Sequence, residues 1–325
     1  MISNNNIAVI IPCYNEGLTI AKVVSDFRKE LPDSNVYVYD NNSSDNTVDE
    51  SRQAGAIVRS EEIQGKGNVV RRMFRDIDAD FYILVDGDDT YDASIAPDML
   101  RTAIYGHYDL VNCIRRETEY DTYRVGHRFG NRMLTGIVRH IFGNRVQDML
   151  SGYKVLSHRF VKSFPALSGG FDIETEITVH ALELSMPVGH VEGHYRGRPE
   201  GSESKLHTYR DGLRILWMII NLFKHERSLQ FFSLIGLVLM LISLALGIPV
   251  AIQFLHTGLV IRLPTAVLAM GIMLVAFLSI MTGLILDTVT RGRLEAKMLT
   301  YLQYSASQLI SQTNSKVRGD GGSVG

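Results

Sequence analysis

Short apolar runs alternate with amphipathic stretches through the first two thirds of the chain. Between the first two runs, the apolar residues from Leu18 to Leu31 fall at the spacing of one helix face. Such alternation predicts an α/β domain with a mostly parallel sheet, whose ligands lie beyond the carboxyl ends of the strands. The expected strands are Ile7–Ile11, Val36–Tyr39, Ala56–Val58, Phe81–Val85 and Leu110–Ile114.

A different pattern begins at Ser228, after which the only ionisable residues as far as Leu286 are His256 and Arg262. A membrane-spanning helix needs roughly 20 apolar residues. Two segments meet this length, with a turn at Arg262 and Pro264 between them. They are Leu229–Leu255 and Leu263–Leu286, and we expect a two-helix transmembrane hairpin.

Basic residues flank both outer ends of this hairpin. Lys224 and Arg227 precede it, and Arg291, Arg293 and Lys297 follow it, which places both flanks in the cytoplasm by the positive-inside rule. The chain also starts with polar residues and lacks the basic and apolar stretches of a secretory signal. We therefore expect an integral membrane protein whose catalytic domain and both termini are cytoplasmic.

The segment before the hairpin has the pattern of an interfacial helix. Its apolar residues from Leu206 to Phe223 share one helix face, whereas Arg210, Arg214 and Lys224 lie toward the other. Packing on the catalytic domain is the alternative. The expected organisation is a catalytic domain over 1–205, an interfacial helix over 206–227, the hairpin over 228–288 and a cytoplasmic tail over 289–325.

Charge and cysteine content exclude some classes of function. The net charge of −2 argues against a nucleic-acid partner that covers the whole protein. Cys13 and Cys113 lie far apart and show no metal-ligand spacing, so neither a disulfide framework nor a zinc site is expected.

Polar residues follow the first two expected strands. Pro12, Tyr14 and Glu16 follow the first, and Asp40 ends the second and leads into Ser43–Asp45. Asp40 could accept hydrogen bonds from a base or ribose, as acidic residues do in other nucleotide folds. Helix capping is an equally good interpretation of Ser43–Asp45.

The strongest signal follows the strand Phe81–Val85, where Asp86, Asp88 and Asp89 place three carboxylates within four positions. Crowded carboxylates repel, and a hard cation such as Mg²⁺ or Mn²⁺ relieves the repulsion while it bridges to substrate phosphates. A solvated acidic turn is the alternative. Upstream, Gly65–Gly67 begins a helical stretch whose amides and Lys66 could face a phosphate or ribose.

In their order and spacing, these motifs resemble family 2 glycosyltransferases with the GT-A (Rossmann-like) fold. The resemblance extends over about residues 5 to 225 and is to the dolichyl-phosphate mannosyl- and glucosyltransferase-like enzymes. The motifs that carry it are Pro12–Glu16, Asp40–Asp45, Gly65–Gly67, Asp86–Asp88, Asp148–Lys154 and Ser202–Lys205.

The resemblance implies a hexosyltransferase whose donor is a nucleotide sugar, with a UDP-sugar favoured over a GDP-sugar. Asp86 and Asp88 would hold Mg²⁺ or Mn²⁺, with Asp89 behind them. Two positions depart from the usual pattern, Asn41 for an acidic residue and Lys154 for arginine. The implied nucleotide-sugar residues are Pro12, Tyr14, Glu16, Asp40, Lys66 and Asp86.

The implied acceptor is a polyisoprenyl phosphate, dolichyl or undecaprenyl, which is already ionised at neutral pH and needs no strong general base. The implied catalytic residues are Asp88, Asp148 and Lys154, with Asp148 orienting the acceptor. Glu174 and Glu176 could contact the sugar or close a helix start, and both interpretations stay open. The candidates for contact with the acceptor phosphate are Arg128, Ser151, Lys154 and Lys205. The three basic residues among them belong to a larger set of arginines and lysines in this part of the chain.

The expected function is therefore inverting, metal-dependent sugar transfer to polyisoprenyl phosphate at the cytoplasmic membrane face. Alternatives are transfer to a saccharide or polymer hydroxyl and a non-catalytic nucleotide-sugar-binding adaptor. A processive polysaccharide synthase fits poorly because the sole tryptophan, Trp217, does not stand in a Gln-x-x-Arg-Trp signature. The sequence leaves a homo-oligomer open.

Overall fold

The computed structural model describes residues 6–117, 136, 148–170, 173–197, 224 and 227–304. The chain divides into two compact units, which are described separately. The sheet unit comprises Met1–Gly212 and Lys297–Gly325, and the hairpin unit comprises Leu213–Ala296. The expected interfacial helix lies almost wholly outside the described residues, as does the tail beyond residue 304.

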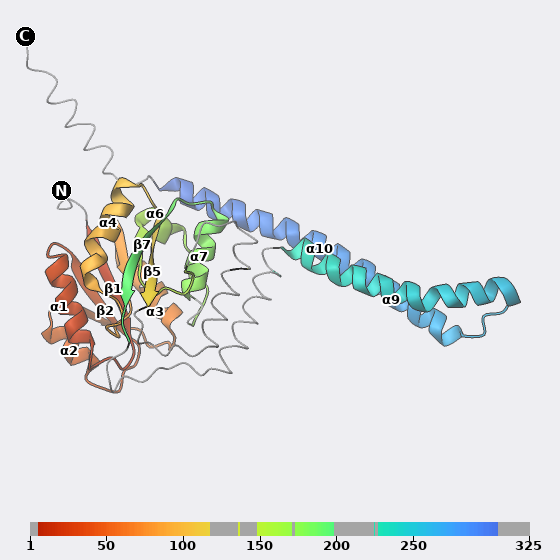
Figure 1. The fold of residues 1–325 in the computed structure, drawn as a ribbon, viewed down its shortest axis with the longest axis horizontal. Helices are drawn as coiled ribbons and strands as arrows, with labels where there is room; N and C mark the ends of the chain where they lie inside the picture. The colour runs from red at the N-terminus through yellow and green to blue at the C-terminus, as the bar shows by residue number, and fades with distance from the viewer. Residues whose placement is uncertain are drawn as a thin grey trace, which may run out of the picture. The chain divides into compact units, whose positions relative to one another are not determined.

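The sheet unit is built on a seven-stranded sheet with the order β3-β2-β1-β4-β6-β5-β7. Figure 1 labels β1, β2, β5 and β7 of this sheet together with the helices of the unit. All neighbouring pairs are parallel except those of β6, which runs antiparallel to both β4 and β5. The strands are β1 (Ile7–Cys13), β2 (Asn35–Asp40), β3 (Ile57–Ser60), β4 (Phe81–Leu84), β5 (Leu110–Glu117), β6 (Lys154–Ser157) and β7 (Val188–Tyr195).

The α/β prediction is confirmed, and the five expected strands correspond to β1 to β5 within a few residues at each end. The sequence did not predict β6 or β7. The helices of this unit are α1 (Ile20–Glu30), α2 (Thr47–Gln53), α3 (Lys66–Asp76), α4 (Ala96–Tyr105), α6 (His158–Ser163) and α7 (Ile173–Glu183), with a short 3₁₀ helix η1 (Ala93–Ile95).

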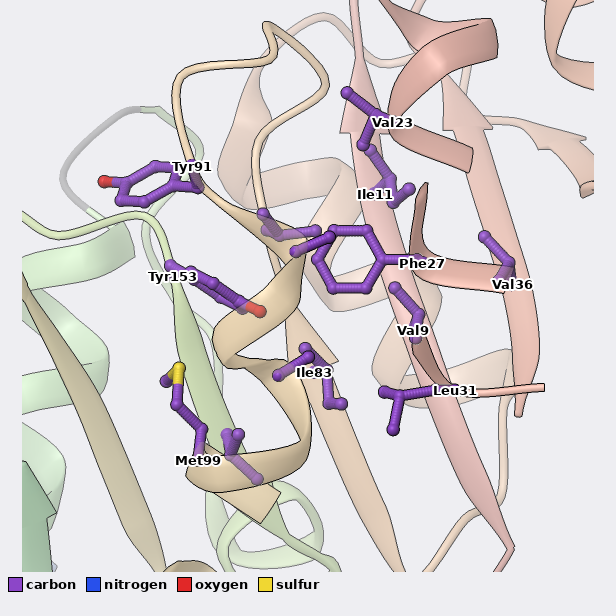
Figure 2. Packing of buried hydrophobic residues seen from close by; sticks show 14 of the residues in the cluster. Val9, Ile11, Val23, Phe27, Leu31, Val36, Ile83, Tyr91, Met99 and Tyr153 are labelled. Carbon is purple, nitrogen blue, oxygen red and sulfur yellow. The ribbon is translucent and has the colours of Figure 1, made fainter. Parts of the chain in front are cut away.

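Two hydrophobic clusters cover the two faces of the sheet. Successive strand residues point to opposite faces, so Val9 and Ile11 of β1 join the cluster with α1 and α4, whereas Ala8 and Ile10 join the cluster with α3, α6 and α7. Figure 2 shows the first cluster, in which Phe27 of α1 packs over the β1 side chains.

Strand directions assign the polar loops to the two edges of the sheet. Because β4 and β5 both run antiparallel to β6, they share one direction. Asp86 follows the end of β4 and Lys154 opens β6, so both lie at the carboxyl edge of β4, where ligands of α/β sheets bind. Asp109 precedes β5 and lies at the opposite edge.

The hairpin unit consists of α9 (Ser228–Thr257, 30 residues) and most of α10 (Leu263–Gln303, 41 residues). Both helices are long and apolar enough to cross a membrane. Most of their large apolar side chains are exposed, unlike those of a core helix in a soluble protein. Ser243 Oγ of α9 donates to the Ala269 carbonyl of α10 at 2.7 Å. This bond gives the hydroxyl a partner, which lipid hydrocarbon could not supply.

Candidate functional site

The turn after β1 is held by the turn after β2. The Asn15 amide donates to Ser43 Oγ at 2.9 Å, and Asn15 Oδ1 accepts from the Ser44 amide at 2.8 Å. Asp45 Oδ1 accepts from the Thr47 amide at 3.0 Å at the start of α2, so the capping interpretation describes part of this turn. Burial raises the pKa of Asp45, whereas hydrogen bonds from the Thr47 hydroxyl and from backbone amides lower it. The donors outweigh burial, so the pKa of Asp45 lies below its ordinary value.

The expected nucleotide residues gather at this edge. Tyr14 is 38% exposed, whereas Pro12, Glu16 and Asp40 are buried. Both Asp40 oxygens lie 3.3 Å from the Ser43 amide, so this carboxylate also fixes the turn that it begins.

Asn41, which departs from the family pattern, connects β2 to the loop before α3. Its Nδ2 donates to the Glu61 and Ile63 carbonyls at 2.8 and 3.0 Å, and its Oδ1 accepts from the Gly65 amide at 2.7 Å. A carboxylate could not make the first two bonds because it has no donor when ionised. Asn41 therefore sets the point where α3 begins.

Lys66 is the first residue of α3 and reaches two carboxylates. Its ammonium lies 2.5 Å from Asp86 Oδ1 and also pairs with Glu174, in the first turn of α7. Burial alone would lower the pKa of Lys66, but the attraction of Asp86 and Glu174 outweighs it and raises that pKa above its ordinary value. The backbone crowds this point, since a Cβ on Gly65 would stand 2.0 Å from the Gly169 carbonyl oxygen and the φ of Gly65 is +131°.

The Asp86 loop also contacts the start of β6. A Cβ on Gly152 would stand 2.2 Å from Asp86 Oδ2, so any other residue at this position would force the Asp86 carboxylate to move. The Gly152 amide donates to the Tyr91 hydroxyl at 2.8 Å. The Ser151–Gly152 pair of the expected acceptor motif therefore lies directly against the expected donor motif.

Asp88 and Asp89 differ in their surroundings. Asp88 is 5% exposed and its Oδ1 accepts from Thr90 Oγ1 at 2.6 Å. Asp89 has a left-handed backbone with φ of 55°, and its Oδ1 pairs with Lys22 of α1 at 2.6 Å. Asp89 is thus directed to a surface lysine.

Within the described ranges, no three His, Cys, Asp or Glu side chains gather as a metal-binding group. Mg²⁺ is commonly held by only one or two carboxylates together with substrate phosphates. The Lys66 ammonium shows that a cation fits against Asp86. A cation can therefore approach Asp86, and the metal role of Asp86 and Asp88 stays a prediction.

Asp148 is bound by Arg115 at the end of β5. Arg115 Nε and Nη2 donate to Asp148 Oδ2 and Oδ1 at 2.8 and 3.0 Å, a bidentate ion pair. The Leu150 amide adds a third donor at 3.2 Å. Arg115 was one of several basic residues in the sequence without a distinct signal, and its position directly after an expected strand was the available clue.

Lys154 and Ser151 are completely buried. The Lys154 ammonium donates to Asn112 Oδ1 at 2.6 Å and to Thr178 Oγ1 at 3.3 Å, and burial lowers its pKa to about 8. Asn112 Nδ2 in turn donates to the Asp148 carbonyl at 2.6 Å. Lys154 therefore lies below the surface at this edge of the sheet, and its contact with a substrate stays a prediction.

The remaining candidates separate clearly. Arg128 and Lys205 lie outside the described residues. Glu174 joins the Lys66 group, whereas Glu176 accepts from the Leu167 and Ser168 amides at 2.8 Å each and fixes the loop before α7. The structure thus distinguishes two glutamates that the sequence left equivalent.

Comparison with known proteins bears on the family and the fold of the chain. The model of the family described as Glycosyl transferase family 2 matches residues 8–164. Glycosyltransferase AglJ of Haloferax volcanii is 32% identical over 249 residues, which cover 76% of this chain and 82% of AglJ. A dolichyl-phosphate hexose transferase of the same organism is 25% identical over 223 residues, which cover 69% of this chain and 96% of that relative.

A solved structure of glucosyl-3-phosphoglycerate synthase from Mycobacterium tuberculosis, in complex with Mn²⁺ and UDP-glucose, shares the fold. The TM-score is 0.58 at 20% identity, and the match covers 69% of this chain and 79% of that chain. This likeness supports the GT-A fold of the sheet unit.

Proposed function

Because the chain belongs to glycosyl transferase family 2 and is a glycosyltransferase, we propose that it transfers a sugar from a UDP-sugar to a polyisoprenyl phosphate. The acceptor phosphate oxygen forms a bond to the anomeric carbon as the bond to the UDP oxygen breaks. The product is a lipid-linked sugar phosphodiester of inverted anomeric configuration.

The observation that carries the acceptor proposal is the presence of two membrane-length helices in the same chain as the donor-site fold. A hydrophobic anchor gives the enzyme access to a substrate that stays in the bilayer. The alignment with a dolichyl-phosphate hexose transferase over 96% of that relative supports the same acceptor class. Catalysis at the cytoplasmic face, with both termini on that side, follows from the flanking basic residues.

The donor would bind at the carboxyl edge of β1, β2 and β4. Tyr14 and Asp40 would take the nucleoside, and Lys66 would meet the diphosphate or ribose. Asp86 and Asp88 would hold Mg²⁺ or Mn²⁺, which supplies positive charge against the departing diphosphate. Mn²⁺ and UDP-glucose accompany the mycobacterial synthase in its crystal structure, which supports this choice of metal and donor.

The Arg115–Asp148 pair favours an acceptor that is already ionised. A general base must have an oxygen in reach of the proton that it takes. Both oxygens of Asp148 are engaged by the guanidinium of Arg115, so Asp148 is poorly placed for that task. A phosphate monoester has a second pKa of about 6 and is largely ionised at neutral pH, so it needs no such base.

The acceptor cations are divided between contact and support in this proposal. Arg128 and Lys205 are the residues proposed to contact the lipid phosphate. Lys154 supports the site from below, because its ammonium binds Asn112, which in turn binds the Asp148 carbonyl. Ser151 supports the turn before β6, where its Oγ accepts from the Tyr153 amide.

The test uses the full-length protein in detergent with UDP-glucose, other nucleotide sugars, Mn²⁺ and polyprenyl phosphate, and identifies the lipid product by mass spectrometry. The matched control replaces polyprenyl phosphate with free polyprenol. We expect a sugar phosphodiester from the phosphate only, and none after chelation of the metal.

Other outcomes would redirect the proposal. Equal product from free polyprenol would replace the phosphate acceptor with a hydroxyl acceptor and leave the donor site in place. Retention of the anomeric configuration would contradict direct attack by the phosphate.

A further inference from the structure

The Lys66 ammonium is shared between two carboxylates that belong to different elements. Asp86 follows β4 and Glu174 stands in the first turn of α7. The exposed fractions of the side chains are 10% for Lys66, 8% for Glu174 and 29% for Asp86. The most accessible member of the group is therefore the carboxylate that the proposed function assigns to the metal.

Lys66 and a divalent cation compete for this carboxylate. The ammonium lies 2.5 Å from Asp86 Oδ1, so this oxygen is neutralised by lysine before any metal arrives. A metal must displace or share that contact to use the oxygen. The cost of moving the ammonium depends on whether another charged acceptor remains for it, because an unpaired buried ammonium is strongly unfavourable.

Glu174 is such an acceptor. We propose that Glu174 is a positioning residue that retains the Lys66 ammonium when Asp86 takes the divalent cation, so that the metal does not leave a buried lysine without a partner. This inference rests on the proposed metal-dependent donor site. It assigns a role in metal loading to a residue that need not contact metal or substrate.

The neutral variant Glu174→Gln tests this role with little change in shape. Glutamine can still accept one hydrogen bond from Lys66, but it offers no charge. The ammonium then depends on Asp86 for its neutralisation. The ammonium is charged in both proteins, but only the carboxylate adds the attraction of opposite charges to the hydrogen bond, a difference that can change an equilibrium about tenfold.

Glu183→Gln is the matched control. Glu183 lies on the same helix, its side chain is 9% exposed, and it pairs with Lys297 at 2.6 Å. Nine residues of helix separate it from Glu174, which is roughly 13 Å along the axis. The two variants thus remove equivalent buried charges at different distances from Asp86.

The measurement is binding of Mn²⁺ to the full-length protein at saturating UDP, followed by the paramagnetic resonance signal of free Mn²⁺. Thermal unfolding of each variant is recorded in parallel. We expect Glu174→Gln to raise the half-saturating Mn²⁺ concentration about tenfold and Glu183→Gln to leave it unchanged. An unchanged value in Glu174→Gln, or equal shifts in both variants, would overturn the proposal.

The double variant Lys66→Met/Glu174→Gln separates positioning from direct ligation. It has the same net charge at this group as the wild type, and it removes the ammonium that competes for Asp86. Its reference is the single variant Lys66→Met, because Lys66 is also proposed to meet the diphosphate or ribose. If Glu174 acts through Lys66, adding Glu174→Gln to Lys66→Met should change the half-saturating Mn²⁺ concentration far less than tenfold. A full tenfold loss in the Lys66→Met background would show that Glu174 acts on the metal without Lys66 and would overturn the positioning role, whereas a wild type that binds no Mn²⁺ would refute the metal-dependent donor site itself.

Discussion

Two carboxylates of the sheet unit, Asp109 and Asp86, lie at opposite edges of the sheet and are neutralised in different ways. Asp109 is 1% exposed and accepts from Arg159 Nε and Nη2 at 2.5 and 2.7 Å, from Ser157 Oγ at 2.6 Å and from the Tyr301 hydroxyl at 2.8 Å. Asp86 is more exposed and shares one lysine with Glu174.

The difference separates a fully satisfied buried group from the proposed metal site. Around Asp109, each oxygen has charged and neutral donors, and the Arg159 guanidinium stacks 4.8 Å from the Tyr301 ring centroid. Around Asp86, the part of the chain that the structure describes supplies one ammonium to two carboxylates, so these three side chains together carry excess negative charge. An excess of this kind costs stability and is expected where a cation belongs to the function.

The largest expected effect comes from removing the satisfied carboxylate. Asp109→Ala leaves Arg159 without its partner, and breaking a buried ion pair in this way costs about 3 to 5 kcal/mol. For a unit of this size, the midpoint of thermal unfolding should fall by roughly 10 °C. Scanning calorimetry in detergent measures the fall.

The control for Asp109→Ala is Asp98→Ala. Asp98 pairs with Arg101 at 2.7 Å, but the two side chains are 66% and 57% exposed. Exposed pairs contribute about 0 to 1 kcal/mol. An equal fall in both variants would show that burial of Asp109 does not set its contribution.

The next largest effect is expected at the carboxyl edge of β4, which carries Asp86 and Asp88. Asp88→Asn keeps an oxygen that can accept from Thr90, so the fold should persist, but it withdraws charge from the proposed metal. We expect turnover to fall about 100-fold with little change in unfolding temperature. Asp89→Asn is the comparison, because Asp89 pairs with the surface residue Lys22 and should lose far less activity. Near-normal turnover of Asp88→Asn at saturating Mn²⁺ would remove Asp88 from the metal site.

The carboxyl edge of β4 was more predictable from the sequence than the opposite edge, which carries Asp109. Strands β1, β2 and β4 are apolar runs that end in polar motifs, and parallel strands bring their carboxyl ends together. The Asp86 loop is therefore evident from the order of residues alone. The strand β6 is not, because it is four residues long and begins with the fully buried Lys154.

Other features depend on contacts that no local pattern encodes. Asp109 and Tyr301 are 192 residues apart, and only the folded chain joins them. Glu174 and Glu176 are two residues apart, which places them about 200° apart around a helix. Their different roles depend on the rotation of α7 against α3, which the sequence does not specify.

A pH effect of intermediate size should come from His180 in the core of the sheet unit. Burial, reinforced by the charge of Lys297, lowers the pKa of His180 to about 4. Between this value and the unfolded value near 6.5, the unfolded chain binds a proton that the folded protein does not. Stability is therefore lost as the pH falls through this window, by roughly 2 kcal/mol at pH 5.

His180→Leu should remove this dependence. The free energy of unfolding of the variant, measured relative to wild type by denaturant titration, should improve by roughly 2 kcal/mol between pH 7 and pH 5. The variant also loses the hydrogen bond between His180 and Ser163. This loss changes the free energy of unfolding by the same amount at each pH and leaves its pH dependence unaffected. A difference that does not vary with pH would show that His180 titrates normally in the folded protein.

The smallest effect isolates one bond of the Asp109 group. Tyr301→Phe removes the hydroxyl that donates to Asp109 Oδ2 at 2.8 Å but keeps the ring beside Arg159. A neutral donor to a carboxylate stabilises by about 1.5 kcal/mol or more, so the unfolding midpoint should fall by roughly 4 °C. Tyr301→Leu, which also removes the cation–π contact, should lower the free energy of unfolding by about 0.5 to 1 kcal/mol more.

Because Asp109 and Asp86 occupy opposite edges of the sheet, both variants should keep the wild-type turnover and the wild-type half-saturating Mn²⁺ concentration. A shift of either quantity in Tyr301→Phe would show that the two edges are coupled and that the Asp109 group is not purely structural.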